Sequence, residues 1–298
     1  MKRFVVNILI FFGIVAVIDF AAGKMFRHIQ ANLAGGRTGA EYYACKESKE
    51  EVIIMGSSRA MHHYVPSIIE DSLGMSCYNA GQDGNGIIMQ YGRWKMISER
   101  YTPRIVIYDV TPDFDLSVND NMAYIDRLKP FCDDKEVKGY VADIFPMERL
   151  KLTSKMYRYN YKFIEMLSDC LRSENDKRGY FPEYGQVRPE AVAKLKGSKP
   201  QQVHLDEEKL RYLEALALEC KEKNVKLVFS VSPWLQGGNV YDESVFAKVK
   251  EIANRNGAAF EYYNGGELSE DETLFKDTYH LNDEGARRFT AVLVSELL

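Results

Sequence analysis

The chain has 298 residues, of which 46% are hydrophobic and 28% are charged. This length and composition suffice for the buried core of one α/β domain with a modest insertion, and they exclude a chain that is mainly disordered. The net charge is −4, and the sequence has no long basic run with interleaved aromatic residues, so nothing in it indicates nucleic-acid binding.

The N-terminal segment bears on location. Two basic residues precede an apolar run from Phe4 to Ala22, which is interrupted by Asn7 and Asp19. The run approaches the length that a helix needs to cross a bilayer, and the basic residues favour a cytoplasmic N-terminus with an exported body. A cleaved signal peptide is the alternative, because small residues follow the run. We predict an uncleaved, single-pass transmembrane anchor over residues 1–23, since the run is long for a signal peptide.

Two further stretches differ from the globular body. Residues 24–50 are polar and contain Gly35 and Gly36, so we expect a juxtamembrane connector. Residues from about 129 to 203 are rich in Tyr, Lys and Arg and interrupt the alternation of strands and helices. This insertion has two interpretations: surface helices with a loop, or a lid whose aromatic side chains stack on a sugar or an acyl chain.

Between residues 51 and 298, apolar strand-like runs alternate with helical patterns. The runs are 51–55, 76–79, 104–110, 225–231 and 258–263, and the helical patterns are 66–73, 206–223, 242–256 and 282–298. Asp206 is available as an N-cap for the second of these helices. The alternation predicts a three-layer α/β sandwich with a mostly parallel, five-stranded sheet, whose ligand lies beyond the carboxyl ends of the strands.

The five cysteines are widely spaced and never form a C-x-x-C pair. They are Cys45, Cys77, Cys132, Cys170 and Cys220. Neither a zinc site nor a dense disulfide framework is indicated, and at least one thiol is unpaired. We expect small apolar side chains packed in the core.

Gly56-Ser57-Ser58 comes directly after the first predicted strand. Glycine permits a tight turn there, and the backbone N–H groups at the start of a following helix can face a developing negative charge. A lone G-S-S is common, and by itself it is more often an N-cap than a nucleophile.

Asp277-Thr-Tyr-His280 precedes the C-terminal helix. A serine nucleophile needs a base to take its proton, and the base needs an acceptor on its other ring nitrogen. In D-x-x-H, one turn of loop brings the carboxylate onto the histidine. Taken alone, the motif favours the other interpretation, an aspartate that caps a turn beside a surface histidine.

Together, a G-x-S after the first strand and a D-x-x-H before the last helix form the arrangement of the SGNH/GDSL hydrolase superfamily. The sequence resembles that superfamily over residues 51–298. The resemblance implies an SGNH, flavodoxin-like fold in which Ser58 is the nucleophile, His280 the base and Asp277 its partner.

The resemblance also implies that the backbone N–H groups of Ser58 and Gly81 bind the oxyanion. Two positions depart from the family pattern: Ser57 replaces the usual aspartate, and the segment at residues 108–113 lacks G-x-N-D. Asn85 is our candidate for the missing asparagine donor. A plain glycine turn is the alternative interpretation of this Gly-Asn-Gly segment.

The G-S-S-R form, the V-T-P segment and the anchor make the chain similar to the membrane-tethered branch that includes DltD and the alginate O-acetyltransferase proteins. This resemblance implies an extracytoplasmic esterase or O-acyltransferase acting on acyl esters of a cell-envelope polysaccharide or related glycan, with a membrane-bound O-acyltransferase as a partner. It requires no metal and no organic cofactor. A lid that excludes water favours transfer over hydrolysis. The alternative is a non-catalytic carbohydrate-binding or scaffolding protein of the same fold.

Three other patterns have weaker interpretations. His62 and His63 lack partners at metal-ligand spacing, so we expect one of them to pack near the serine loop. Glycines 81, 84 and 86 do not have dinucleotide-loop spacing. Ser232-Pro233 either lines the cleft or simply ends a strand.

Overall fold

A computed structural model describes residues 1–33, 35–119, 121–171, 178–195, 203–236, 241 and 243–297, with the backbone alone at 121–124. The chain divides into two compact units. We call Met1–Tyr43 with Ile125–Asp176 the anchor unit, and Ala44–Tyr124 with Lys177–Leu298 the α/β unit.

The α/β unit is built on a five-stranded sheet in which all neighbouring strands are parallel. The strands are β1 (Val52–Gly56), β2 (Cys77–Asn79), β3 (Ile105–Asp109), β4 (Lys226–Val231) and β5 (Ala259–Tyr262). Their order, β2-β1-β3-β4-β5, is that of flavodoxin-like sheets, and β1 lies inside the sheet next to the point where the strand order reverses. The predicted fold class and all five predicted strands are confirmed.

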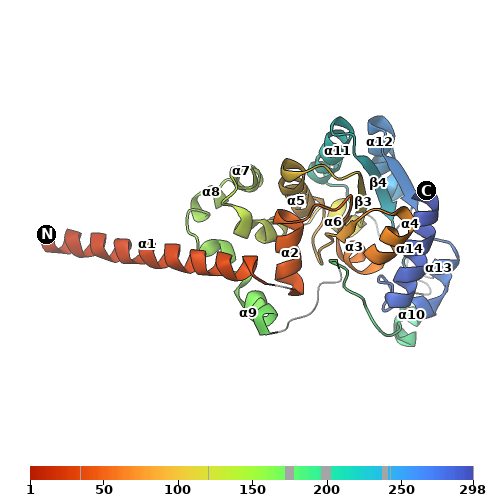
Figure 1. Cartoon of the computed structure of the whole chain (residues 1–298), viewed down its shortest axis with the longest axis horizontal. Helices are drawn as coiled ribbons and strands as arrows, with labels where there is room; N and C mark the ends of the chain where they lie inside the picture. The colour runs from red at the N-terminus through yellow and green to blue at the C-terminus, as the bar shows by residue number, and fades with distance from the viewer. Residues whose placement is uncertain are drawn as a thin grey trace. The chain divides into compact units, whose positions relative to one another are not determined.

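Helices cover both faces of this sheet (Figure 1). One layer contains α5 (Ile87–Arg100), α11 (Glu207–Glu222) and α12 (Ala247–Asn256), and the other contains α3 (Ser58–His63), α4 (Pro66–Leu73) and α14 (Asp283–Leu297). Alternate residues of β1, Val52 and Ile54, pack with Tyr64, the C-cap residue of α3, and with Phe289 of α14. Asp206 caps α11 as predicted, because its carboxylate accepts the N–H groups of Glu208 and Lys209.

The shorter helices of the α/β unit are α6 (Pro112–Asp115), α10 (Pro189–Leu195), α13 (Glu267–Glu270) and the 3-10 turns Glu243–Phe246 and Glu272–Leu274. The other helical segments are α1 (Lys2–Ala31), α2 (Gly36–Lys46), α7 (Lys135–Ile144), α8 (Glu148–Lys151), α9 (Phe163–Leu171) and the 3-10 helices Asn121–Phe131 and Tyr157–Tyr159.

Helix α1 extends beyond the predicted anchor. Among the described residues it is the one helix long and apolar enough to cross a membrane, a composition that a signal sequence shares. Its Asp19 carboxylate accepts hydrogen bonds from Ser154 Oγ (2.5 Å) and from the N–H groups of Lys155 (2.7 Å) and Met156 (3.0 Å). A side chain at Gly23 would collide with Lys155. Residues 24–50, expected as a juxtamembrane connector, continue α1 to Ala31 and include α2.

The predicted insertion at 129–203 is divided between the two units. Residues 125–176 belong to the anchor unit, whereas residues 178–195 belong to the α/β unit. There, Phe181 N–H donates to the Met61 carbonyl, and Val187 N–H donates to the Phe275 carbonyl. The last part of the predicted insertion is therefore joined to α3 and to the segment before α14.

Gly56, the last residue of β1, has a constrained backbone that leads the chain to Ser58. Gly56 has a φ of +136°, and a Cβ there would lie 2.6 Å from the Asp109 carbonyl oxygen. We expect Gly56→Ala to lower the free energy of unfolding by about 2–5 kcal/mol, because left-handed strain and steric overlap add. Gly74→Ala is the matched control, since Gly74 has a φ of +63° but open space around it.

The control should cost about 1–2 kcal/mol. Both variants are measured by denaturant unfolding of the full chain in the same detergent. Equal losses would show that the turn after β1 is not sterically constrained.

Candidate active site

Ser58 lies where β1 gives way to α3. Ser57 is the N-cap residue and Ser58 is the first residue of the helix, so the serine sits at the carboxyl end of an inner strand. Ser57 is fully buried, whereas Ser58 is partly exposed. The two adjacent hydroxyls thus differ in access, and only that of Ser58 reaches a histidine.

Ser58, His280 and Asp277 form a continuous line of hydrogen bonds, although 222 positions separate the serine from the histidine. Ser58 Oγ lies 2.8 Å from His280 Nε2, and His280 Nδ1 lies 3.0 Å from Asp277 Oδ2. A carboxylate accepts only, so Nδ1 carries the proton and Nε2 accepts from the Ser58 hydroxyl. The imidazole is thereby held in the tautomer that can take a proton from Ser58.

Asp277 is kept in its ionised form. Partial burial alone would raise the pKa of its carboxyl, but hydrogen bonds from the His280 ring and from the backbone N–H groups of Tyr279 and His280 outweigh burial and lower that pKa. The backbone bonds also fix the carboxylate within one turn of loop, as the D-x-x-H spacing predicts. Because its side chain is 51% exposed, the orientation of Asp277 depends on these bonds.

His63 holds the chain next to His280. The ring is fully buried, and its Nε2 accepts the N–H of Leu281 at 3.0 Å, so its Nδ1 donates to Ser232 Oγ at 2.9 Å. Burial, reinforced by the charge of Arg59, lowers the pKa of His63 well below its usual value, and the ring stays neutral. The expectation that one of the two histidines packs near the serine loop is met by His63.

His62 has the opposite character. Its ring nitrogens lie 2.5 Å from the Phe181 carbonyl and 2.9 Å from Asp83 Oδ1, and both partners are acceptors. Burial would lower the pKa of His62, but the hydrogen bond and charge of Asp83 raise it above its usual value. Its ring centroid lies 5.8 Å from that of His280, at right angles. His62 therefore lies beside His280 with both of its ring nitrogens facing acceptors.

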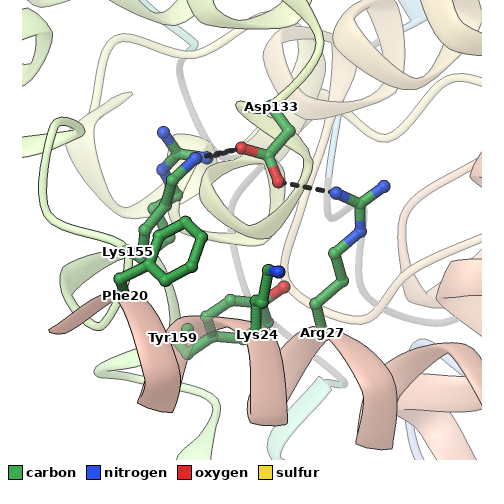
Figure 2. A pocket seen from close by; sticks show the side chains of 8 residues that line it. Phe20, Lys24, Arg27, Asp133, Lys155 and Tyr159 are labelled. Carbon is green, nitrogen blue, oxygen red and sulfur yellow. Dashed lines mark hydrogen bonds and ion pairs between the residues drawn. The ribbon is translucent and has the colours of Figure 1, made fainter. Parts of the chain in front are cut away.

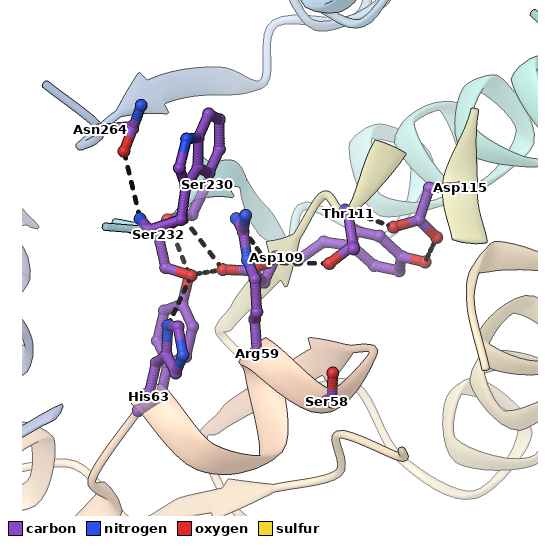
Figure 3. A network of polar contacts seen from close by, with 12 residues as sticks. Ser58, Arg59, His63, Asp109, Thr111, Asp115, Ser230, Ser232 and Asn264 are labelled. Atoms are coloured by element: carbon purple, nitrogen blue, oxygen red, sulfur yellow. Dashed lines mark hydrogen bonds and ion pairs between the residues drawn. The ribbon is translucent and has the colours of Figure 1, made fainter. Parts of the chain in front are cut away.

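Figure 3 shows a buried polar network beside α3, which was not predicted from the sequence. The Asp109 carboxylate, at the end of β3, accepts from Arg59 Nη2 (3.1 Å), Tyr64 Oη (2.5 Å) and Ser232 N–H (3.2 Å). Arg59 also lies over the Trp234 ring, 5.1 Å from its centroid. One signal was available: an acidic residue ends an otherwise apolar strand. Ser232 follows the end of β4, is fully buried and supports this network through its N–H group and its hydroxyl.

The predicted oxyanion donors have different surroundings. Gly81 N–H donates to Asn79 Oδ1 at 2.9 Å, because the Asn79 amide nitrogen is turned toward the carbonyls of Ala60 and Tyr64. This N–H is therefore not free in the structure, which differs from the expectation for a donor to substrate. A Cβ at Gly81 would lie 2.4 Å from Met61 N, so close packing on α3 independently requires glycine.

Asn85 is almost buried, and its side-chain nitrogen donates to the Asp83 carbonyl at 2.8 Å. One of its two amide hydrogens is used in this bond, so the second remains for another acceptor. Among the described residues, no group of three or more His, Cys, Asp or Glu side chains could hold a metal ion.

No family model and no curated protein matches the chain. Similar solved structures include a protein assigned to the G-D-S-L lipolytic family from Desulfitobacterium hafniense, with 8% identity and a TM-score of 0.43, covering 82% of this chain and 98% of that chain. A GDSL-like lipase from Bacteroides thetaiotaomicron has 12% identity and a TM-score of 0.39, covering 94% and 100%. A Bacteroides fragilis protein assigned as an acylhydrolase has 12% identity and a TM-score of 0.39, covering 92% and 96%. Likenesses this distant carry no inference about activity.

Proposed function

We propose that the protein is a serine esterase or O-acyltransferase that uses Ser58 as nucleophile, His280 as general base and Asp277 as the partner of the base. The observation that carries this proposal is the unbroken hydrogen-bonded line from Ser58 Oγ through both ring nitrogens of His280 to Asp277. A base that touches the nucleophile and is oriented by a third group is the minimum requirement for activating a serine.

In the first half-reaction, Ser58 Oγ attacks the ester carbonyl while its proton passes to His280 Nε2. The negative charge of Asp277 stabilises the resulting imidazolium. The tetrahedral intermediate then collapses, the bond to the leaving alkoxide breaks, and His280 returns the proton to that oxygen. The products of this step are a free alcohol and an acyl-Ser58 ester.

In the second half-reaction, water or an alcohol acceptor loses a proton to His280 as its oxygen attacks the acyl-Ser58 carbonyl. Collapse of the second intermediate returns the proton to Ser58 Oγ and releases an acid or a new ester. Hydrolase and transferase therefore share every protein group and differ only in the acceptor.

For the oxyanion we propose the backbone N–H of Ser58 and the second amide hydrogen of Asn85. The first N–H groups of a helix lack intrahelical acceptors, which suits Ser58 for this role. The Gly81 N–H could bind the oxyanion only after its hydrogen bond to Asn79 Oδ1 is broken. Each donor of this kind is worth about 10²–10³ in rate.

We further propose that the substrate is an acyl ester of a cell-envelope glycan, and that the α/β unit lies outside the cytoplasmic membrane, on the periplasmic or extracellular side. Lys2 and Arg3 at the start of α1, together with the hydrogen bonds of Asp19 within the anchor unit, support an uncleaved anchor. A membrane-bound O-acyltransferase is the proposed acyl source. The second candidate function is a non-catalytic glycan-binding protein, which the departure at Ser57 favours.

The triad is tested by non-additive loss of activity. Ser58→Ala and His280→Ala should each lower kcat/KM on a small activated acetyl ester by at least about 10³-fold, and the double variant should be hardly worse. Asp277→Ala should cost less, because the ring can still accept a proton. Ser57→Ala is the control, since its neighbouring hydroxyl is buried.

A fluorophosphonate probe should label the wild type and the Ser57→Ala variant but not Ser58→Ala. Circular dichroism checks folding of each variant. No activity and no labelling of the wild type would favour the non-catalytic candidate, whereas full activity of Ser58→Ala and His280→Ala would overturn the proposed triad.

Acceptor choice separates transferase from esterase. Because an acyl-enzyme that serves a glycan must outlive attack by water, we expect an oligosaccharide acceptor to collect acetyl groups from the activated ester. Mass spectrometry of the oligosaccharide and an acetate assay measure the two products, with Ser58→Ala as the blank. Acetate as the sole product, at a rate independent of the acceptor, would identify an esterase.

The anchor is tested by fractionation and protease access. We expect the full-length chain, with its original N-terminus, in the membrane fraction, because α1 is retained as a signal anchor. Protease added to intact spheroplasts should digest the α/β unit, while a cytoplasmic control protein stays intact. A shortened chain beginning near residue 23, found in the soluble fraction, would indicate a cleaved signal peptide.

A further inference from the structure

Helix α9 of the anchor unit turns its apolar side outward. Its exposed positions are Phe163 (45% exposed), Ile164 (80%), Leu167 (51%), Cys170 and Leu171 (84%). These positions recur at the spacing that places residues on one face of a helix. A helix on a water-soluble surface has the reverse polarity.

The inward face of α9 is correspondingly polar. Lys162, the residue directly before α9, is fully buried and pairs with Glu41 of α2. Glu165 accepts two hydrogen bonds from Arg127. Asp169 accepts the N–H of Thr38 at 2.8 Å.

These pairings fix which face of α9 is outward. Rotating the helix to hide its apolar side would break the ion pairs and leave charges without partners. Such a loss costs several kcal/mol for buried pairs.

The position of α9 along α1 places it at the end of the apolar segment. Met166, between the two faces of α9, packs in a cluster with Phe26, Ala22 and Ile29 of α1. The Phe163 and Phe26 ring centroids are 5.7 Å apart. Phe26 lies four residues beyond Ala22, which is about 6 Å along a helix. The headgroup layer of a bilayer is of this order of thickness, roughly 5–7 Å on each side.

The anchor unit has other exposed apolar side chains. Met156, whose N–H donates to Asp19, is 42% exposed. Leu150 and Met147, at α8, are 72% and 70% exposed. Asp19, which the loop of Ser154, Lys155 and Met156 contacts, lies near the C-terminal end of the apolar run.

A basic pocket lies beside these residues in the anchor unit (Figure 2). Lys24, Arg27, Lys155 and Arg158 surround one carboxylate, Asp133. Arg27, Lys155 and Arg158 all pair with that carboxylate. Four cations and one anion give this pocket a net charge of +3, which is complementary to lipid phosphates.

We propose that the anchor unit is a lipid-contacting platform, with the outward face of α9 lying in the interface of the same membrane that holds α1. The proposal rests on the proposed role of α1 as a membrane anchor. Apolar side chains enter the boundary between headgroups and acyl chains, and the basic pocket faces the phosphates. The charged inward face of α9 remains packed within the protein.

The chain supplies its own reporter for this surface. Among the described cysteines, Cys170 is exposed and the other four are buried. The wild-type, full-length protein is labelled at Cys170 with an environment-sensitive fluorophore and reconstituted into liposomes of phosphatidylglycerol and phosphatidylcholine. Nitroxide lipids labelled near the glycerol end of the acyl chain and aqueous iodide then act as competing quenchers. The control carries Cys170→Ser and Glu222→Cys, which moves the label to the exposed polar end of α11.

We expect the nitroxide lipids to quench the Cys170 label at least about twofold more strongly than the Glu222→Cys label, because an interfacial helix buries its apolar face about 5–10 Å into the boundary. Iodide should show the opposite order. Leu167→Asn with Leu171→Asn, both at exposed positions, should reduce nitroxide quenching at Cys170 without releasing the protein from the liposomes.

Strong iodide quenching of Cys170 with little nitroxide quenching, in liposomes that retain the protein, would overturn the proposal while leaving the anchor intact. It would leave a membrane protein partner as the occupant of this face. Loss of the whole protein from the liposomes would overturn the anchor and this proposal together. Neither result bears on the activity of Ser58.

Discussion

The arrangement of the candidate site depends on one buried carboxylate. Asp109 ends β3 inside the core and accepts hydrogen bonds from Arg59 and Tyr64 of α3 and its C-cap, and from the N–H of Ser232 after β4. An unpaired charge in this position would be costly, so the groups that satisfy it are held in place. Because Arg59 follows Ser58, the same bond that neutralises Asp109 fixes the first turn of α3. The position of the Ser58 hydroxyl therefore depends on the burial of the Asp109 carboxylate at the end of β3, the central strand of the sheet.

Sequence reasoning reached the parts of this arrangement that are local. Apolar runs and an N-cap at Asp206 predict the strands and α11, and the D-x-x-H spacing predicts the contact between Asp277 and His280. The role of Asp109 could not be predicted, because its donors Arg59, Tyr64 and Ser232 lie 45 to 123 positions away and share no motif. The hydrogen bond of Gly81 to Asn79 could not be predicted for a related reason: the orientation of Asn79 is decided by two carbonyls of α3 and its C-cap.

Adjacent histidines illustrate how position decides charge. His62 and His63 follow each other in α3, yet one faces two acceptors and the other faces an N–H donor. The pKa of His62 is raised and that of His63 is lowered. The interaction of protonated His62 with the Asp83 carboxylate stabilises the fold at a pH below the ordinary histidine pKa. This stabilisation is lost as the pH rises through the raised pKa of His62. No periodicity or composition in the sequence distinguishes these two residues.

The same limit applies to α9, where periodicity identifies an amphipathic helix but not the medium outside it. A pattern with apolar residues at 163, 164, 167 and 171 normally predicts a face turned to the core. Here Lys162 pairs with Glu41 of α2, and Glu165 pairs with Arg127 of the 3-10 helix Asn121–Phe131. These two ion pairs leave the apolar face of α9 outward. Such polarity is stable in water only at a cost of about 25 cal/mol for each Å² of exposed apolar surface. In the proposed lipid interface that cost is removed. The same bilayer would then surround α1 and contact the outward apolar face of α9.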